Sequence, residues 1–177
     1  MLEIYFILSQ LLVLCAIVTD YISFQYKERK KILLILSISS LLVAIHYLLL
    51  NQVNAFVFEV LILSAFLVSA YTTSKKVLVL FLVVFLFPLI FNYSGYQDIL
   101  IFIGVYISLI AKFQKNDKLI RILTMLGTLF IIMYNIIIFT PMGVLLELMY
   151  LISNISGFYK FYMKNKVNQN KIKQKIK

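Results

Sequence analysis

Long apolar runs alternate along this chain with short polar segments that are rich in lysine. Most of the runs approach the roughly 20 apolar residues that an α-helix needs to cross the hydrocarbon core of a membrane. The pattern predicts an all-α membrane protein with seven transmembrane helices. We expect them at residues 4–25, 32–50, 54–72, 77–92, 97–112, 119–139 and 142–162.

The fourth and fifth predicted helices are short, and the basic residues indicate that they are two. All 17 Lys and Arg residues fall in four clusters, at 27–31, 75–76, 112–121 and 160–177. Cationic loops stay on the cytoplasmic side of a membrane, and a single helix over 77–111 would place two clusters on opposite sides. Two crossings, joined by a polar turn at 92–98, keep all four on one side. We therefore expect the amino terminus outside and the carboxyl terminus inside.

Composition limits the remaining possibilities. The chain is 63% hydrophobic and 14% charged, so we expect one membrane domain over residues 1–163 and a basic cytoplasmic tail over 164–177. The abundance of Lys, Asn and Ile indicates an AT-rich bacterial genome and hence the bacterial inner membrane. The net charge of +10 lies at helix ends, where anionic lipid headgroups are better partners than nucleic acid. Oligomerisation is left open.

Residue types exclude most enzyme and cofactor chemistry. Cys15 and His46 are single residues of their kind, so neither a disulfide framework nor a cysteine or histidine metal cluster can form. The chain has no phosphate-binding glycine loop and no nucleophile or zinc-protease motif. We expect a protein that is not an enzyme and that holds no cofactor or metal.

An internal repeat emerges when the chain is shifted by 88 residues. The hairpin at 32–71 then overlies 120–159 without a gap, and Glu59 coincides with Glu147. This register predicts two parallel three-helix repeats, at about 4–72 and 97–162, joined by a linker helix at about 77–92. Such a 3+1+3 layout gives both halves the same orientation in the membrane.

Ionisable and amide side chains inside the predicted helices are the candidate functional groups, because they are costly in hydrocarbon. We expect His46, Glu59, Asn135 and Glu147 to line a polar pocket in the outer half of the membrane, and His46 could pair with Glu59. Asn154 lies seven residues after Glu147 and is either a solute contact or an interhelical hydrogen-bonding group. Each of these groups could instead serve only to hold helices together.

Asp20 lies near the inner end of the first predicted helix, one turn before a basic loop. We expect it to form a salt bridge with Lys27 or Lys30 rather than to belong to the pocket. The serines at 37, 39 and 40 are expected to be small-residue contacts between helices.

Several short motifs resemble those of the YgjV-type family of bacterial inner membrane proteins, over most of residues 9–163. They are Ser9-Gln10, the basic loop KERKK, Ser40 with His46-Tyr47-Leu48-Leu49, Tyr134-Asn135, and Glu147 with Asn154. That family tends to have a second histidine where this chain has Tyr134. More distantly, the seven-helix layout is similar to that of the sugar-efflux, PQ-loop and nicotinamide-riboside transporters, although the Pro-Gln dipeptide is absent.

Two functions follow as hypotheses. The first is a carrier of an unidentified small polar solute, with His46, Glu59, Asn135, Glu147 and Asn154 as solute contacts or proton-coupling groups. The alternative is a membrane scaffold or regulator that transports nothing, in which the same groups only bind helices to one another.

Overall fold

The structure, a computed structural model, describes residues 2–51, 53–87, 95–139 and 141–164. In these ranges the chain forms seven α-helices. They are α1 (Leu2–Ser23), α2 (Arg29–Leu49), α3 (Val53–Tyr71), α4 (Lys75–Val84), α6 (Tyr96–Lys112), α7 (Asp117–Ile137) and α8 (Pro141–Phe158). A π-helical turn, Tyr159–Met163, extends α8.

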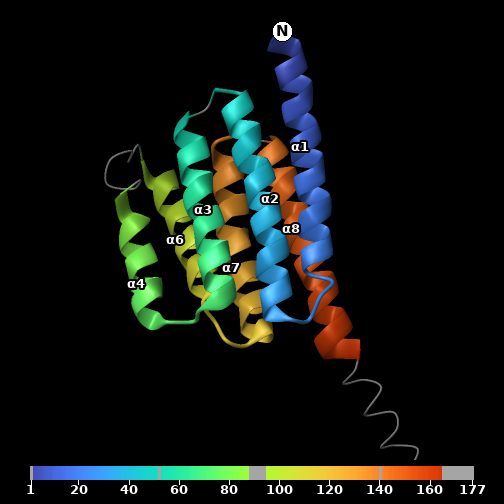
Figure 1. Cartoon of the computed structure of the whole chain (residues 1–177), viewed down its shortest axis with the longest axis vertical. Coiled ribbons are helices and arrows are strands. Elements are labelled where there is room, and N and C mark those ends of the chain that lie inside the picture. Colours follow the sequence, from blue (N-terminus) through green and yellow to red (C-terminus); the bar gives the residue numbers. More distant parts are fainter. Residues whose placement is uncertain (1, 52, 88–94, 140, 165–177) are drawn as a thin grey trace, which may run out of the picture.

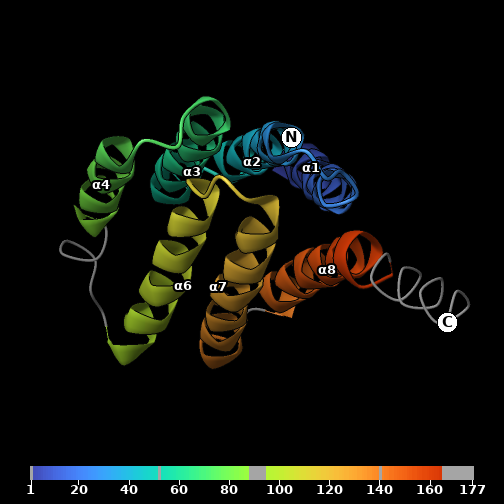
Figure 2. The same ribbon diagram turned by 90° about the horizontal axis from the view of Figure 1, so that it is seen from below.

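The helices form two rows that face each other (Figure 2). In one row α1 packs on α2 and α2 on α3; in the other α6 packs on α7 and α7 on α8. Contacts of α1 with α8 and of α3 with α6 join the rows, and α4 packs against α6. Helices α1, α3, α6 and α8 run in one direction, and α2, α4 and α7 run in the other (Figure 1).

The loops between α1 and α2, α3 and α4, and α6 and α7 lie at one end of the bundle, which we call the basic end (Figure 1). It carries Lys27, Lys30, Lys75, Lys76, Lys115 and Lys118. The prediction that basic loops meet at one end is confirmed for these residues. So is the division of 77–111, because α4 and α6 are separate helices that run in opposite directions.

Three described helices are both long and apolar enough to cross a membrane: Ile4–Ser23, Arg29–Leu49 and Asp117–Ile137. Phe56–Tyr71 is a shorter apolar helix. The outward faces are also apolar; on α1, for example, Leu11, Leu14 and Val18 are more than half exposed. The predicted basic tail, residues 164–177, falls outside the described residues except for Lys164.

Local sequence explains several helix ends. The side chain of Asn116 accepts a hydrogen bond from the backbone N–H of Lys118 at 2.9 Å, and Asp117 adds a negative charge to the first turn of α7. Both features stabilise a helix amino terminus. Pro141 is the first residue of α8, where its missing N–H costs no hydrogen bond.

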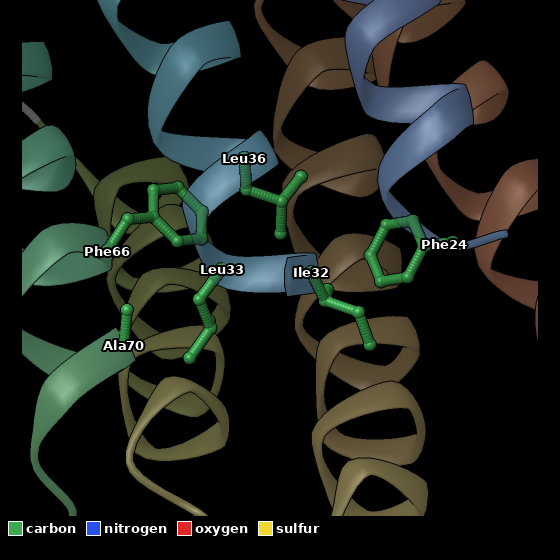
Figure 3. Close-up of a cluster of buried hydrophobic side chains, with 6 residues drawn as sticks. All are labelled: Phe24, Ile32, Leu33, Leu36, Phe66 and Ala70. Atoms are coloured by element: carbon green, nitrogen blue, oxygen red, sulfur yellow. The ribbon is translucent and has the colours of Figure 1, made fainter. Parts of the chain in front are cut away.

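An apolar cluster closes the interior near the basic end. It consists of Phe24, Ile32, Leu33, Leu36, Phe66 and Ala70, contributed by the end of α1, the first turns of α2 and the second half of α3 (Figure 3). All six side chains are buried, and Tyr150 of α8 packs against them with its ring edge-on to Phe24 at 5.0 Å.

The guanidinium of Arg29 binds backbone carbonyls at the ends of two other helices. It donates to the carbonyl of Lys112 at 2.9 Å and to that of Gln114 at 2.6 Å, both at the end of α6. It also donates to carbonyls at the end of α3, those of Ser69, Ala70 and Thr72. The last carbonyls of a helix lack partners within the helix, so Arg29 joins α2, α3 and α6 at the basic end.

Arg121 of α7 likewise binds backbone carbonyls at the end of α1. It is fully buried and donates to the carbonyl of Phe24 at 2.9 Å and to that of Tyr26. Its guanidinium also lies over the rings of Phe24 and Phe161, at 5.6 and 5.3 Å. The two arginines thus bind the rows to each other at the basic end.

Helices α6 and α7 touch at two glycines. A Cβ on Gly127 would lie 2.3 Å from the hydroxyl oxygen of Ser108 and 2.7 Å from the backbone oxygen of Gly104. A backbone oxygen cannot move away as a flexible side chain can, so this close approach requires glycine. Small residues that let helix backbones approach are typical of membrane helix pairs.

Gly127→Ala is expected to destabilise the protein by about 1–3 kcal/mol, the usual range for overpacking a tight contact. Unfolding in mixed detergent micelles, followed by circular dichroism, measures the change. Gly95→Ala is the matched control, because a Cβ there would meet only the flexible side chain of Gln97. Equal stability of both variants would contradict the proposed close contact.

Candidate functional site: a polar cavity between the two rows

A cavity of about 590 Å³ lies between the two rows of helices. Its lining comes from α1, α2 and α3 on one side and from α6, α7 and α8 on the other, with Phe85 added at the end of α4. Leu36 and Phe66 belong both to the lining and to the apolar cluster, which therefore forms the floor toward the basic end. Ile138 and Gly143 place the other limit of the cavity at the end of α7 and the first turn of α8.

Three carboxyl groups border this cavity, one from each of three helices: Asp20 of α1, Glu59 of α3 and Glu147 of α8. Asp20 is hydrogen-bonded to Ser39, and Glu59 accepts a hydrogen bond from the hydroxyl of Ser40. Among the described residues no three acidic, histidine or cysteine side chains lie close enough to hold a metal ion. The carboxyls are therefore distributed around the cavity instead of gathered at one point.

Lys112 is the basic residue of the lining. It is the last residue of α6, and its ammonium lies 4.3 Å from the centre of the Phe66 ring. It interacts electrostatically with Glu59 and Glu147. Within the described ranges, however, the ion pair found within 4 Å is that of Lys31 with Glu28 on the surface, so Lys112 makes no direct ion pair there.

Neutral polar groups complete the lining. They are the side chains of Ser39, Ser40, Tyr47, Ser108, Thr128, Tyr134, Asn135 and Tyr150. Apolar residues such as Val43, Ile62 and Val105 fill the space between them. A mostly apolar wall with a few placed polar groups is the usual character of a small-molecule site.

The structure places Glu59, Asn135 and Glu147, three of the predicted site residues, on the wall of this cavity. Whether they contact a solute stays a prediction. They belong to α3, α7 and α8, on both sides of the space between the two rows.

His46 does not line the cavity, contrary to the prediction. Its Nδ1 donates to the carbonyl of Ser9 on α1 at 3.0 Å, and the Ser9 hydroxyl accepts from Gln10 at 3.3 Å. Glu59 is on the far side of α2 from this contact and binds Ser40, so the suggested His46–Glu59 pair is not formed. The reason is helical geometry, because residues 40 and 46 point in different directions around α2.

Asn154 also lies away from the cavity. It is fully buried and donates from Nδ2 to the carbonyl of Arg121 at 3.0 Å, joining α8 to α7 near the basic end. Of its two predicted roles, the structure supports the interhelical hydrogen bond.

Asp20, Lys112 and the two arginines are the residues whose positions the sequence did not reveal. The salt bridge expected between Asp20 and Lys27 or Lys30 is wrong: Asp20 turns inward, one helical turn after the buried Ala16. In the sequence, the charges of Arg29 and Arg121 predict only which side of the membrane their loops occupy. They are the only two arginines among the 17 Lys and Arg residues. An arginine offers five hydrogen-bond donors in one plane, so its use in place of lysine indicates that it binds several acceptors, here backbone carbonyls.

Comparison with known families now places the chain. The sequence model of Imp-YgjV, described as a bacterial inner membrane protein, matches residues 7–165. The chain belongs to this family. The match covers every helix that borders the cavity, and it includes Ser9, Gln10 and His46, which meet at the α1–α2 contact. Searches of curated proteins and of solved structures find no match.

Membership assigns the chain to the bacterial inner membrane, and the apolar helices agree with that location. The family description names no activity.

Proposed function

We propose that this chain is a carrier of a small polar solute, with seven transmembrane helices in a 3+1+3 arrangement and its basic end in the cytoplasm. The observation that carries the proposal is the cavity. Three carboxyls and a lysine around a space of about 590 Å³ are costly inside a membrane domain unless water or a solute occupies it. Carriers commonly place their binding site between two structural repeats.

Recurrent features at a spacing of 88 residues support the repeat. Glu59 and Glu147 are separated by this number, and both border the cavity. Asn51 and Phe139 have the same separation, and they follow α2 and α7 with φ angles of 56° and 57°. Left-handed backbone is uncommon at residues other than glycine, so its recurrence in one register favours a shared local structure.

The arginine contacts support the same register. The carbonyls that accept from Arg121 belong to Phe24 and Tyr26; two of those that accept from Arg29 belong to Lys112 and Gln114. Residues 24 and 26 become 112 and 114 after a shift of 88. Each row thus supplies an arginine to the end of the first helix of the other row. Only the acceptor carbonyls share the register, because a shift of 88 places Arg29 on Asp117.

The same contacts suggest which state of a carrier is present. The apolar cluster and both arginines close the basic end, whereas the cavity extends to the opposite ends of α7 and α8. This arrangement fits an outward-facing carrier. Release of Arg29 and Arg121 from their carbonyls would allow the opposite opening, with the two rows moving as units.

Reconstitution of the whole chain into liposomes tests the proposal. Uptake of radiolabelled amino acids, amines, nucleosides and sugars is measured with and without a pH gradient, against liposomes that lack protein. We expect uptake of at least one class, and a response to the pH gradient would add proton coupling. Folded protein that takes up none of these solutes would favour the scaffold function, for which the contacts of His46 and Asn154 suffice.

A further inference from the structure

The charged groups of the cavity are divided between two walls. Asp20 and Glu147 come from α1 and α8, which contact each other. Lys112 comes from α6, which contacts α3, the helix that bears Glu59. One wall is therefore doubly acidic, whereas the other combines an ammonium with a carboxyl.

Each wall contains a charged group without a close protein partner. The carboxyl of Glu147 accepts no hydrogen bond from the described residues, unlike those of Asp20 and Glu59. Lys112 makes no ion pair within 4 Å in the same part of the chain, and its ammonium rests on the ring of Phe66. Unpaired charges away from bulk water are costly, and a ligand with both signs of charge would satisfy both groups together.

We propose that the cavity binds a small zwitterion, with its ammonium at Asp20 and Glu147 and its anionic group at Lys112. The binding claim rests on the cavity, and only the transport of such a solute rests on the proposed function. The formal charges of the three carboxyl groups and the one amino group sum to −2, which alone would favour a simple cation. Lys112 favours a zwitterion over a simple cation. A cation would leave the Lys112 ammonium without an anionic partner and would add a second positive charge to the same cavity.

Matched ligands that differ only in their charged ends test this inference. The full chain in detergent micelles is titrated calorimetrically with 4-aminobutyrate, butylamine and butyrate. Glycine and 6-aminohexanoate, with their corresponding amines and acids, extend the series to shorter and longer molecules. We expect at least one zwitterion to bind about tenfold or more tightly than its amine and its acid, the effect of one added charge-assisted contact.

Two variants assign the two ends of the ligand. Lys112→Met is expected to lower zwitterion affinity about tenfold or more and to leave amine affinity unchanged or raised. Glu147→Gln is expected to weaken the zwitterion and the amine together. Lys115→Met, an exposed loop lysine, is the control and should bind as the unmodified chain does. Thermal melts verify that each variant is folded.

Equal affinity for zwitterion and amine, unchanged preference in folded Lys112→Met, or no binding of any zwitterion would overturn the inference. These failures differ from failure of the carrier proposal. Zwitterion binding without uptake into liposomes would remove the carrier and keep the site. Uptake of another solute class alone would keep the carrier and remove the zwitterion site.

Discussion

Glu147→Gln is expected to reduce solute uptake about tenfold to a hundredfold, the range for loss of one charged hydrogen-bonding partner. The side chain borders the cavity and accepts no hydrogen bond from the described residues, so its charge is available to a solute or proton. Glutamine keeps the shape and removes the charge. Uptake into liposomes, normalised to reconstituted protein, measures the effect.

Two further glutamates make this prediction specific. Glu28→Gln changes an exposed residue whose pair with Lys31 is on the surface, and such pairs contribute little to stability, so uptake should be unchanged. Glu59→Gln should have a smaller effect than Glu147→Gln, because Glu59 is already bound by Ser40. Unaltered uptake in folded Glu147→Gln would remove this residue from the mechanism.

Arg121→Met is expected to lower the free energy of unfolding by about 3 kcal/mol, the upper range for one hydrogen bond to a charged group. The substitution removes the donors of the Phe24 and Tyr26 carbonyls and the contacts with two aromatic rings. Arg121→Lys should be intermediate, since an ammonium cannot reproduce the planar donor set. Unfolding in mixed micelles, followed by circular dichroism, measures all variants.

Lys118→Met is the matched control for Arg121, because Lys118 is exposed and lies one turn earlier on the same helix. It should retain nearly full stability. If Arg121→Met were as stable as this control, the carbonyl contacts would not hold α1 to α7.

Features set by long-range patterns were predictable from the sequence. Basic clusters separated by apolar runs indicated that the basic loops meet at one end and that α4 and α6 are distinct. A shift of 88 residues aligns Glu59 with Glu147, and both of these residues border one cavity. Such patterns indicate how deep a residue lies in the membrane and in which direction its helix runs. Both quantities follow from the position of the residue along the chain.

The direction in which a side chain points around its helix was not predictable in the same way. His46 and Glu59 were expected at similar depth, yet His46 points to α1 while Glu59 points into the cavity. Asp20 and Lys112 were assigned to the basic end because of nearby loop charges, although both line the cavity. Their rotation depends on which helices become neighbours, and a nearly uniform apolar sequence carries little information about that.

The central claim is that the cavity is a solute path that opens to each side of the membrane in turn. Sided labelling of a cysteine in the cavity tests it most directly. Ser108→Cys is introduced together with Cys15→Ser, which removes the exposed native cysteine. Membrane-impermeant maleimide is then applied to either face in sealed right-side-out and inverted vesicles. We predict labelling from both faces, faster from the face opposite the basic end. Protection from both faces in folded protein would contradict a solute path of this kind.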